Sequence, residues 1–339
     1  MPSIVDVAKL AGVSVTTVSR VINNSSHPLN SETRDRVLNA ASQLNFVPSA
    51  LARALVSDST RIIGIIVGDA SDPYFAAIVR GISDVARENG YLTMVCNSDR
   101  VSQMELSYVR LMSNYHVDGL IFAGGGLNDD DYLGEMRQLI DGLKERNIPV
   151  IILGSHRFQA HQISIDNVQA AMDMTEYLIG LGHRRIGFIQ GPEVLSTSIL
   201  RLKGYRQALE KHNIYYDPNL VVTSNFTYED GPRVADLLLE RKPRPTAIFG
   251  SNDLVTIGCL GRLRELGIAV PGEISLAGFD DISPARYVEP PLTTISVPMR
   301  EMGATGMRHL LEMITSGVQF EEIHVLPYTL VERASCAPS

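Results

Sequence analysis

IVDVAKLAGVSVTTVSRVIN, residues 4–23, is the stretch of sequence that decides the fold. Its apolar residues recur at helical spacing on both sides of Gly12, which predicts two short amphipathic helices. Gly12 supplies the tight turn between them, because a positive φ is needed there and glycine adopts it at little cost. Ser14 is expected to cap the second helix by accepting a backbone N–H. Helix, short glycine turn and helix form the pattern of a helix-turn-helix.

Each predicted helix has one buried stripe. The residues expected to face the core are Ile4, Val7, Ala8, Ala11, Val18, Val21 and Ile22. The other face of the second helix carries Val15, Thr16, Ser19 and Arg20. A packed pair of helices that touches no DNA is the alternative interpretation, and such pairs are the commoner structure. The turn alone therefore does not decide between the two.

The exact sequence of the motif favours DNA binding. D-V-A-x-x-A-G-V-S-x-x-T-V-S-R-V-I-N resembles the amino-terminal signature of the lactose-repressor/galactose-repressor family of bacterial transcription regulators. Further segments are typical of the same family: GLGHRRIGFI, RLKGYRQAL, RPTAIFGSND, VPGEISLAGFDD and PLTTISVP. The resemblance covers residues 4 to about 333. It implies a ligand-responsive transcription regulator, a repressor that binds a pseudo-palindromic operator in double-stranded DNA as a homodimer.

Composition limits the remaining classes. The chain has 339 residues, 45% of them hydrophobic and 20% charged, which suits a soluble globular protein of two or three domains. It has no apolar run of about 18 residues, so no membrane association is expected. Residues 1–20 lack the apolar core of a secretory signal, and the cysteines Cys96, Cys259 and Cys336 are widely spaced. We therefore expect a cytoplasmic protein with reduced thiols.

Charge alone does not locate a DNA site. The net charge is −8, yet the first 58 residues carry +1 and the remainder −9. An amino-terminal segment with a net charge of +1 is only weakly basic, so the prediction of DNA binding rests on the helix-turn-helix geometry and on the motif.

A third helix and a short linker follow the motif. Ser31 is expected to cap a helix over residues 32–45, with Val37, Leu38, Ala41 and Leu44 at helical spacing. Residues 50–55 resume a helical pattern that is too short to persist unaided, so a disordered linker is one interpretation. The family resemblance implies a hinge helix that folds on DNA, pairs with its dimer mate and wedges Leu55 between minor-groove base steps.

From residue 61 onward, apolar runs of five or six residues alternate with helical patterns. Such alternation predicts βαβ units and parallel sheets that are covered on both faces. A break near ISID, residues 163–166, divides the runs into two similar α/β halves with a cleft between them.

The expected fold class is therefore an all-α helix-turn-helix headpiece plus an α/β core of two parallel-sheet subdomains. The resemblance makes that core similar to periplasmic binding proteins. The predicted domains are residues 1–47 for the headpiece, 48–60 for the hinge helix and linker, and 61–339 for the effector-binding and dimerisation core. The resemblance also implies three crossings, near residues 162, 292 and 325. One subdomain is then about 61–162 with 293–324, and the other about 163–292 with 325–339.

The recognition helix supplies candidate DNA contacts. Arginine can read guanine bidentately, threonine can reach a base edge, and valine can contact a thymine methyl. The resemblance places base contacts at Val15, Thr16 and Arg20, and a solvated helix face is the alternative. Backbone phosphates are the expected partners of Ser14, Thr17 and Ser19.

Residues near strand ends supply candidate effector contacts. Carboxylate, amide and guanidinium groups together with aromatic faces suit a polyhydroxylated ligand. The candidates are Asp69, Phe75, Arg201, Phe226, Asn252 and Asp280. The resemblance implies effector contact for the residues matching Arg201, Asn252 and Asp280. Helix capping is the alternative for Asp69, and core packing is the alternative for Phe226.

Two departures from the family pattern refine the effector and the assembly. Purine-binding members carry an arginine six residues before the one matching Arg201, and Leu195 stands there in this chain. A small sugar or sugar derivative is therefore expected, with a non-sugar corepressor as the alternative. Members of the lactose-repressor type end in leucine heptads, whereas this sequence ends in ERASCAPS, so we expect a dimer.

Two other classes compete with a regulator. A solute-binding protein of a transporter shares the core, but the missing signal and the added headpiece argue against it. An enzyme would need a catalytic constellation, and the sequence has no nucleophile–base motif, Walker loop or dinucleotide fingerprint. Neither a metal site nor a cofactor is expected, because His, Cys and Asp show no ligand spacing.

Overall fold

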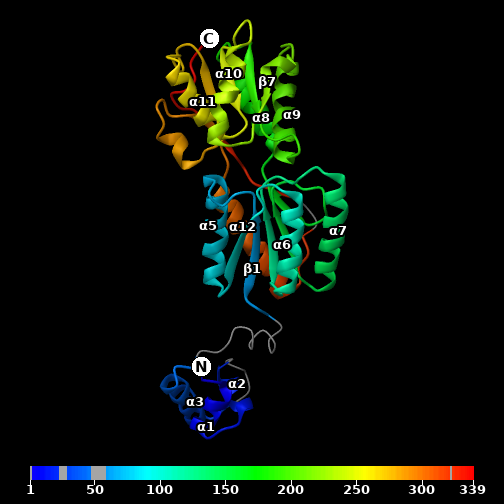
Figure 1. The fold of residues 1–339 in the computed structure, drawn as a ribbon, viewed down its shortest axis with the longest axis vertical. Coiled ribbons are helices and arrows are strands. Elements are labelled where there is room, and N and C mark those ends of the chain that lie inside the picture. Colours follow the sequence, from blue (N-terminus) through cyan, green and yellow to red (C-terminus); the bar gives the residue numbers. More distant parts are fainter. Residues whose placement is uncertain (1, 23–28, 47–58, 321–322) are drawn as a thin grey trace. The chain divides into compact units, whose positions relative to one another are not determined.

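The computed structural model describes residues 2–22, 29–46, 59–320 and 323–339. The chain divides into two compact units, Met1–Arg61 and Ile62–Ser339, each of which is described by itself (Figure 1). The predicted hinge residue Leu55 and most of the predicted linker lie outside the described residues. In the described part of the chain, no helix combines the length and apolar character needed to cross a membrane.

The first unit is a bundle of short helices, α1 (Ile4–Ala11), α2 (Val15–Ile22) and α3 (Ser31–Gln43). Its buried core consists of Val7, Ala8, Ala11, Val18, Val21, Val37, Ala40 and Ala41. Gly12 has a φ of 65° and donates its N–H to the last carbonyls of α1, which confirms the predicted turn. The predicted cap is also confirmed, because Ser14 Oγ accepts the N–H of Thr17 at 3.1 Å.

The start and the buried face of α3 differ from the prediction. Asn30, not Ser31, caps the helix, and its side-chain oxygen accepts the N–H of Glu32 at 3.1 Å. Leu38 is 47% exposed, whereas Ala40 is buried. Two small alanines on the buried stripe let α3 pack closely on its neighbours, and that stripe turns Leu38 toward solvent.

The second unit has two lobes, each built on a six-stranded sheet (Figure 1). The first sheet is parallel and has the order β11-β5-β4-β3-β1-β2. Its strands are β1 (Ile62–Val67), β2 (Leu92–Asn97), β3 (Gly119–Ala123), β4 (Val150–Leu153), β5 (His161–Ser164) and β11 (His324–Val325). The second sheet has the order β12-β10-β9-β8-β6-β7, with only β12 antiparallel to its neighbour. Its strands are β6 (Ile186–Gln190), β7 (Val221–Thr223), β8 (Ala247–Gly250), β9 (Ser275–Asp280), β10 (Thr293–Ser296) and β12 (Thr329–Val331).

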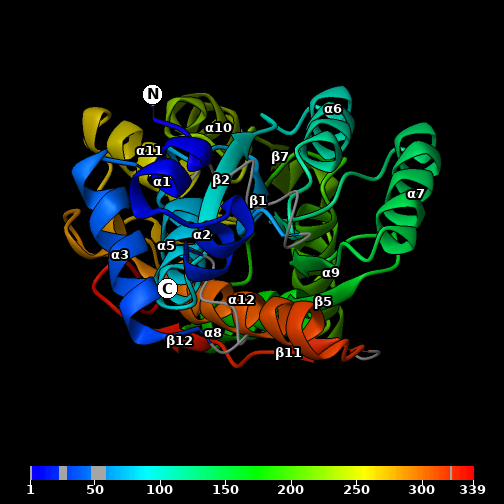
Figure 2. The same ribbon diagram turned by 90° about the horizontal axis from the view of Figure 1, so that it is seen from below.

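Helices cover both faces of the first sheet. One face carries α5 (Pro73–Glu88) and α12 (Met299–Ser316), and the other carries α6 (Ser102–Asn114) and α7 (Asp130–Glu145), as Figure 2 shows. Successive residues of β1 alternate between these layers, with Ile65 and Val67 toward α5 and α12 and Ile66 toward α6 and α7. The helices α5 and α12 approach closely, since a Cβ at Gly81 would lie only 2.0 Å from the carbonyl oxygen of Arg300.

The second lobe has the same layered plan. The helix α8 (Asn167–Gly180) packs on α9 (Ser196–Lys211), and α10 (Gly231–Leu239) packs on α11 (Asp253–Glu265). A short 3-10 helix, η2 (Tyr228–Asp230), precedes α10, which begins with a Gly-Pro pair.

The chain passes between the lobes slightly later than predicted at two of the three crossings. Strand β5 still pairs with β4 in the first sheet, and β10 still pairs with β9 in the second. The crossings near 162 and 292 therefore follow these strands, whereas the third lies between β11 and β12, close to the expected residue 325. An apolar run predicts a strand, but pairing with residues distant in sequence decides which sheet it joins.

Candidate functional site

One candidate surface is the outer face of α2. Val15 is 40% exposed, and Thr16 and Arg20 are also exposed, while Val18 and Val21 on the opposite face are buried. The hydroxyls of Ser14 and Thr17 lie 2.9 Å apart at the start of the helix. The helix thus presents short side chains and one guanidinium together, an arrangement whose size and donors suit the edges of bases in a major groove.

The second candidate site is a cavity between the two lobes of the core. It encloses about 50 Å³ of free space, which is room for only a few water molecules. Its polar lining comes from both lobes, with Asp72, Arg100 and His156 from the first and Arg201, Asn252 and Asp280 from the second. Such a cavity lies beyond the carboxyl ends of the parallel strands, where open α/β sheets place their ligands.

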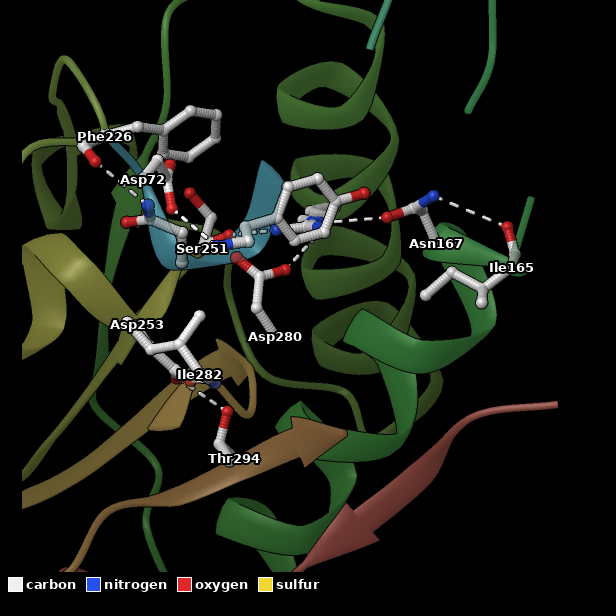
Figure 3. Close-up of polar contacts among 12 residues, drawn as sticks. Asp72, Ile165, Asn167, Phe226, Ser251, Asp253, Asp280, Ile282 and Thr294 are labelled. Atoms are coloured by element: carbon white, nitrogen blue, oxygen red, sulfur yellow. Dashed lines mark hydrogen bonds and ion pairs between the residues drawn. The ribbon is translucent and has the colours of Figure 1, made fainter. Parts of the chain in front are cut away.

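Arg201 and Asp280 form a buried ion pair on the second-lobe wall, 5% exposed each. The Arg201 guanidinium donates to Asp280 Oδ1 at 3.1 Å, to Asn167 Oδ1 at 2.9 Å and to the carbonyl of Ser251 (Figure 3). It also lies 3.6 Å from the centre of the Phe279 ring. Burial raises the pKa of Asp280 to about 7, although Arg201 acts in the opposite direction. The pair is therefore held rigidly at the cavity wall.

Asn252 and Phe226 position each other on the same lobe. The Asn252 amide donates to the carbonyl of Phe226 at 3.0 Å, and its oxygen caps α11 by accepting the N–H of Val255 at 3.1 Å. Phe226 has a φ of 65°, and its ring occupies the space in front of Gly191, where a Cβ would lie 2.0 Å from it. Together with Leu195, the Phe226 ring packs against the core of the first lobe, so both alternatives for Phe226, packing and lining the cavity, are realised.

Phe75 lines the first-lobe side of the cavity, and Asp69 does not. The Phe75 ring lies against Gly68 and Gly124, where an added Cβ would come within 3.0 and 2.8 Å of it. Asp69 turns away to accept the N–H and the hydroxyl of Ser71, at 2.8 and 2.7 Å. Asp69 therefore closes a local turn and does not line this cavity, as the alternative of a capping role allows, and its contact with an effector stays a prediction.

Asp72 occupies the place that Asp69 was expected to take. It is 9% exposed, lines the cavity and caps α5 by accepting the N–H of Tyr74 at 2.9 Å. Burial raises the pKa of its carboxyl group. The signal was present in the sequence, because an aspartate before a proline after a strand is typical of a helix start.

Arg100, Glu105 and His156 also line the cavity, although the sequence did not predict them. Arg100, near the end of β2, donates to the carbonyl of Asn225 in the other lobe at 3.3 Å. Glu105 accepts the hydroxyls of Ser98 and Tyr132, and burial raises its pKa. His156 is 9% exposed, and burial lowers its pKa to about 4. No local pattern marks these residues, because only the packing of distant segments brings them to the cavity.

The described residues contain no cluster of His, Cys, Asp and Glu that could hold a metal ion. Thr197 is the only serine or threonine among the residues that line the cavity, and its hydroxyl makes no hydrogen bond to a histidine in the described part of the chain. What the lining offers is a set of fixed hydrogen-bonding groups and aromatic faces, which is the chemistry of a binding site.

Two family models match the chain. Residues 3–49 match the bacterial regulatory proteins of the lacI family, and residues 175–336 match the periplasmic binding protein-like domain. A curated relative, the HTH-type transcriptional repressor PurR of Vibrio atlanticus, is 33% identical over 99% of this chain and 98% of its own length.

Solved structures agree with these matches. The Lac repressor dimer bound to operator and the anti-inducer ONPF is 28% identical, with a TM-score of 0.87 over 99% of both chains. The complex of the transcriptional regulator CelR with cellobiose is 32% identical, with a TM-score of 0.72 over 99% of this chain and 100% of that one.

Proposed function

The chain belongs to the lacI family of bacterial regulatory proteins. From that premise we propose that a small sugar or sugar derivative binds in the interlobe cavity and alters the affinity of the protein for a pseudo-palindromic operator. The protein is a ligand-responsive transcription repressor that binds operator DNA as a homodimer. Because a repressor acts where the chromosome lies, we place it in the cytoplasm. We also propose that it binds its effector without catalysing a reaction.

The observation that carries the sugar proposal is the lining of the cavity. A buried Arg201–Asp280 pair and the Asn252 amide stand beside the rings of Phe75 and Phe226. Polar groups of these types bond sugar hydroxyls, and a ring covers the apolar face of a pyranose. The cellobiose complex of a regulator 32% identical to this chain supports the same ligand class.

The size of the cavity indicates how the ligand acts. Free space of about 50 Å³ is small for a sugar, and we propose that the lobes separate to admit one. A ligand that binds one spacing of the lobes better than another shifts the equilibrium between them. We propose that this spacing sets the geometry of the paired hinge segments in the dimer. A coupling of about 1–3 kcal/mol would change operator affinity by roughly 5- to 150-fold, and DNA would change effector affinity by the same factor.

The test is operator affinity measured with and without sugars. Operator sequences are first selected from random DNA with the full-length protein, and fluorescence anisotropy then compares the selected operator with random duplex. We expect a clear preference for the operator, a fall in affinity with salt, and a shift caused by at least one sugar from a panel of monosaccharides and disaccharides. A shift toward tighter binding would identify a corepressor. Operator preference that no sugar alters would overturn the sugar proposal and favour the alternative non-sugar effector.

Arg20→Ala is expected to weaken binding to the selected operator by about 1–3 kcal/mol and to relax selection at one base of each half-site. The exposed guanidinium of Arg20 can donate two parallel hydrogen bonds to guanine, which alanine cannot replace. Arg20→Lys keeps the charge but loses the planar fork, so it should lose the same base preference. Repeating the selection with each variant measures the effect, and Arg264→Ala on the second lobe serves as control. If Arg20→Lys keeps the preference, the residue contacts phosphate instead.

A further inference from the structure

Unused hydrogen-bond acceptors gather in the interlobe cavity. Asp72 and Asp280 each accept through one carboxylate oxygen, from Tyr74 N–H and from Arg201, and the second oxygen of each meets no donor among the described residues (Figure 3). His156 donates through Nε2 to the carbonyl of Gly124 at 3.2 Å, so its Nδ1 is an acceptor. That buried nitrogen also has no partner in the described part of the chain.

The donors of the inner wall are partly engaged. Each nitrogen of the Arg201 guanidinium bonds an oxygen, on Asn167, Ser251 and Asp280. The Asn252 amide bonds the carbonyl of Phe226. The terminal nitrogens of Arg201 and Asn252 each carry a second N–H, and Arg100 bonds Asn225 through a single nitrogen. The inner wall therefore offers a ligand both acceptors and N–H donors.

Carboxyl groups outnumber guanidinium groups in the lining of the cavity. The lining holds the carboxyl groups of Asp72, Glu105 and Asp280 against the guanidinium groups of Arg100 and Arg201. Arg201 is paired with Asp280, and two hydroxyls satisfy Glu105. Asp72 makes no ion pair with any described residue, although it is 9% exposed. Arg100 lowers the pKa of Asp72 without forming an ion pair with it, and a cation in direct contact would stabilise this buried carboxylate further.

Asp72 and Asp280 face each other from opposite lobes. Asp72 begins α5 of the first lobe and Asp280 ends β9 of the second, and the negative charge of Asp72 helps to raise the pKa of Asp280. Two like charges across a cleft disfavour its closure.

Taking the sugar-responsive function above as the premise, we propose that the effector is a polyol carrying a protonated amine, an amino sugar, whose ammonium group is held between Asp72 and Asp280. An ammonium group has three donors and no acceptor, which complements the unused carboxylate oxygens of Asp72 and Asp280. Its charge replaces the repulsion between the lobes with attraction to both. The hydroxyls of the same ligand can accept from Arg100 at the edge of the cavity.

The experiment compares sugars that differ only in one group. Full-length protein is titrated at pH 7 with glucosamine against glucose and galactosamine against galactose, by calorimetry and thermal shift. At least one amino sugar should bind about tenfold or more tightly than its hydroxyl partner, the range expected for a hydrogen-bonded charge. Asp72→Asn should remove most of that preference, because asparagine keeps the oxygen that caps α5 but not the charge.

Asp129→Asn is the matched control. Asp129 caps α7 in the same way, accepting the N–H of Tyr132 at 3.0 Å, but it is exposed and does not line the cavity. The control should keep the amino-sugar preference. Without ligand, Asp72→Asn should match or exceed the wild type in melting temperature, because it removes a buried charge that no ion pair holds.

Several outcomes would overturn the inference. Neutral sugars that bind as tightly as their amino partners would reject it while leaving a sugar effector in place, whereas the absence of binding in both series would reject the sugar function as well. A preference that survives Asp72→Asn would remove Asp72 from the site. A lower melting temperature of the ligand-free Asp72→Asn variant, with Asp129→Asn unchanged, would show that the carboxylate is already compensated.

Discussion

Arg201→Met is expected to lower the free energy of unfolding of the core by about 3–5 kcal/mol and to abolish the response to sugars. The guanidinium of Arg201 is buried, and its loss would raise the pKa of Asp280 further, so that Asp280 must take up a proton or remain a buried charge without a counterion. It would also leave the side-chain oxygen of Asn167 and the carbonyl of Ser251 without their donor. Urea denaturation followed by circular dichroism measures the first effect, and sugar-induced thermal shift measures the second.

A second substitution and a control on the same helix separate charge from packing. Arg201→Met combined with Asp280→Leu removes both charges, so it should recover part of the lost stability while the sugar response stays absent. Lys203→Met, an exposed position on α9, should change both quantities little. If Arg201→Met unfolds at the same urea concentration as Lys203→Met, the ion pair does not stabilise the second lobe.

Leu55→Ala is expected to weaken operator binding by about 2–3 kcal/mol, or roughly 30- to 150-fold, without unfolding the headpiece. The resemblance to the family assigns this leucine to the minor groove, where an apolar wedge holds the duplex in a bent form that alanine is too short to hold. Leu55 lies outside the described residues, so this expectation rests on the sequence. Fluorescence anisotropy with the selected operator measures the loss.

Effector response tests the same residue independently. If the hinge carries the signal, the residual binding of Leu55→Ala should also respond less to the effector, because the element that couples cavity and DNA is impaired. Leu266→Ala, an exposed leucine at the end of α11, is the control and should behave as wild type. Full affinity and full response in Leu55→Ala would mean that the coupling passes through another element.

The headpiece could be predicted closely because its signals are local. The turn depends on the backbone freedom of Gly12, and the cap depends on a hydroxyl three residues from the N–H that it accepts. Most elements of the core were predicted for a similar reason, since the period of apolar residues reports the local structure. The same reasoning placed Leu38 on the buried stripe, because periodicity identifies an apolar residue but not how closely two helices approach.

The cavity could be predicted only in part, because its lining is assembled from distant segments. Arg201, Asn252 and Asp280 follow from the family motifs, and the structure brings them to one wall. Asp69 and Asp72 are both acidic residues near the end of β1, and only the direction of each side chain separates them. Arg100 and His156 come to the cavity from segments after β2 and β4, which no short pattern connects.

Because the chain crosses between the lobes three times, the lobe that is begun first during synthesis is not the one that is completed first. The first lobe begins with β1, but α12, which packs on α5 and covers one face of its sheet, is synthesised more than a hundred residues later. Until then the emerging polypeptide exposes the apolar side of α5. By residue 296 all strands of the second sheet except β12 have been synthesised, so the second lobe can fold before the first lobe is complete. Nascent molecules should therefore need protection from aggregation mainly on the α5 side, and truncated translation products should be cleared rather than accumulate as half-molecules.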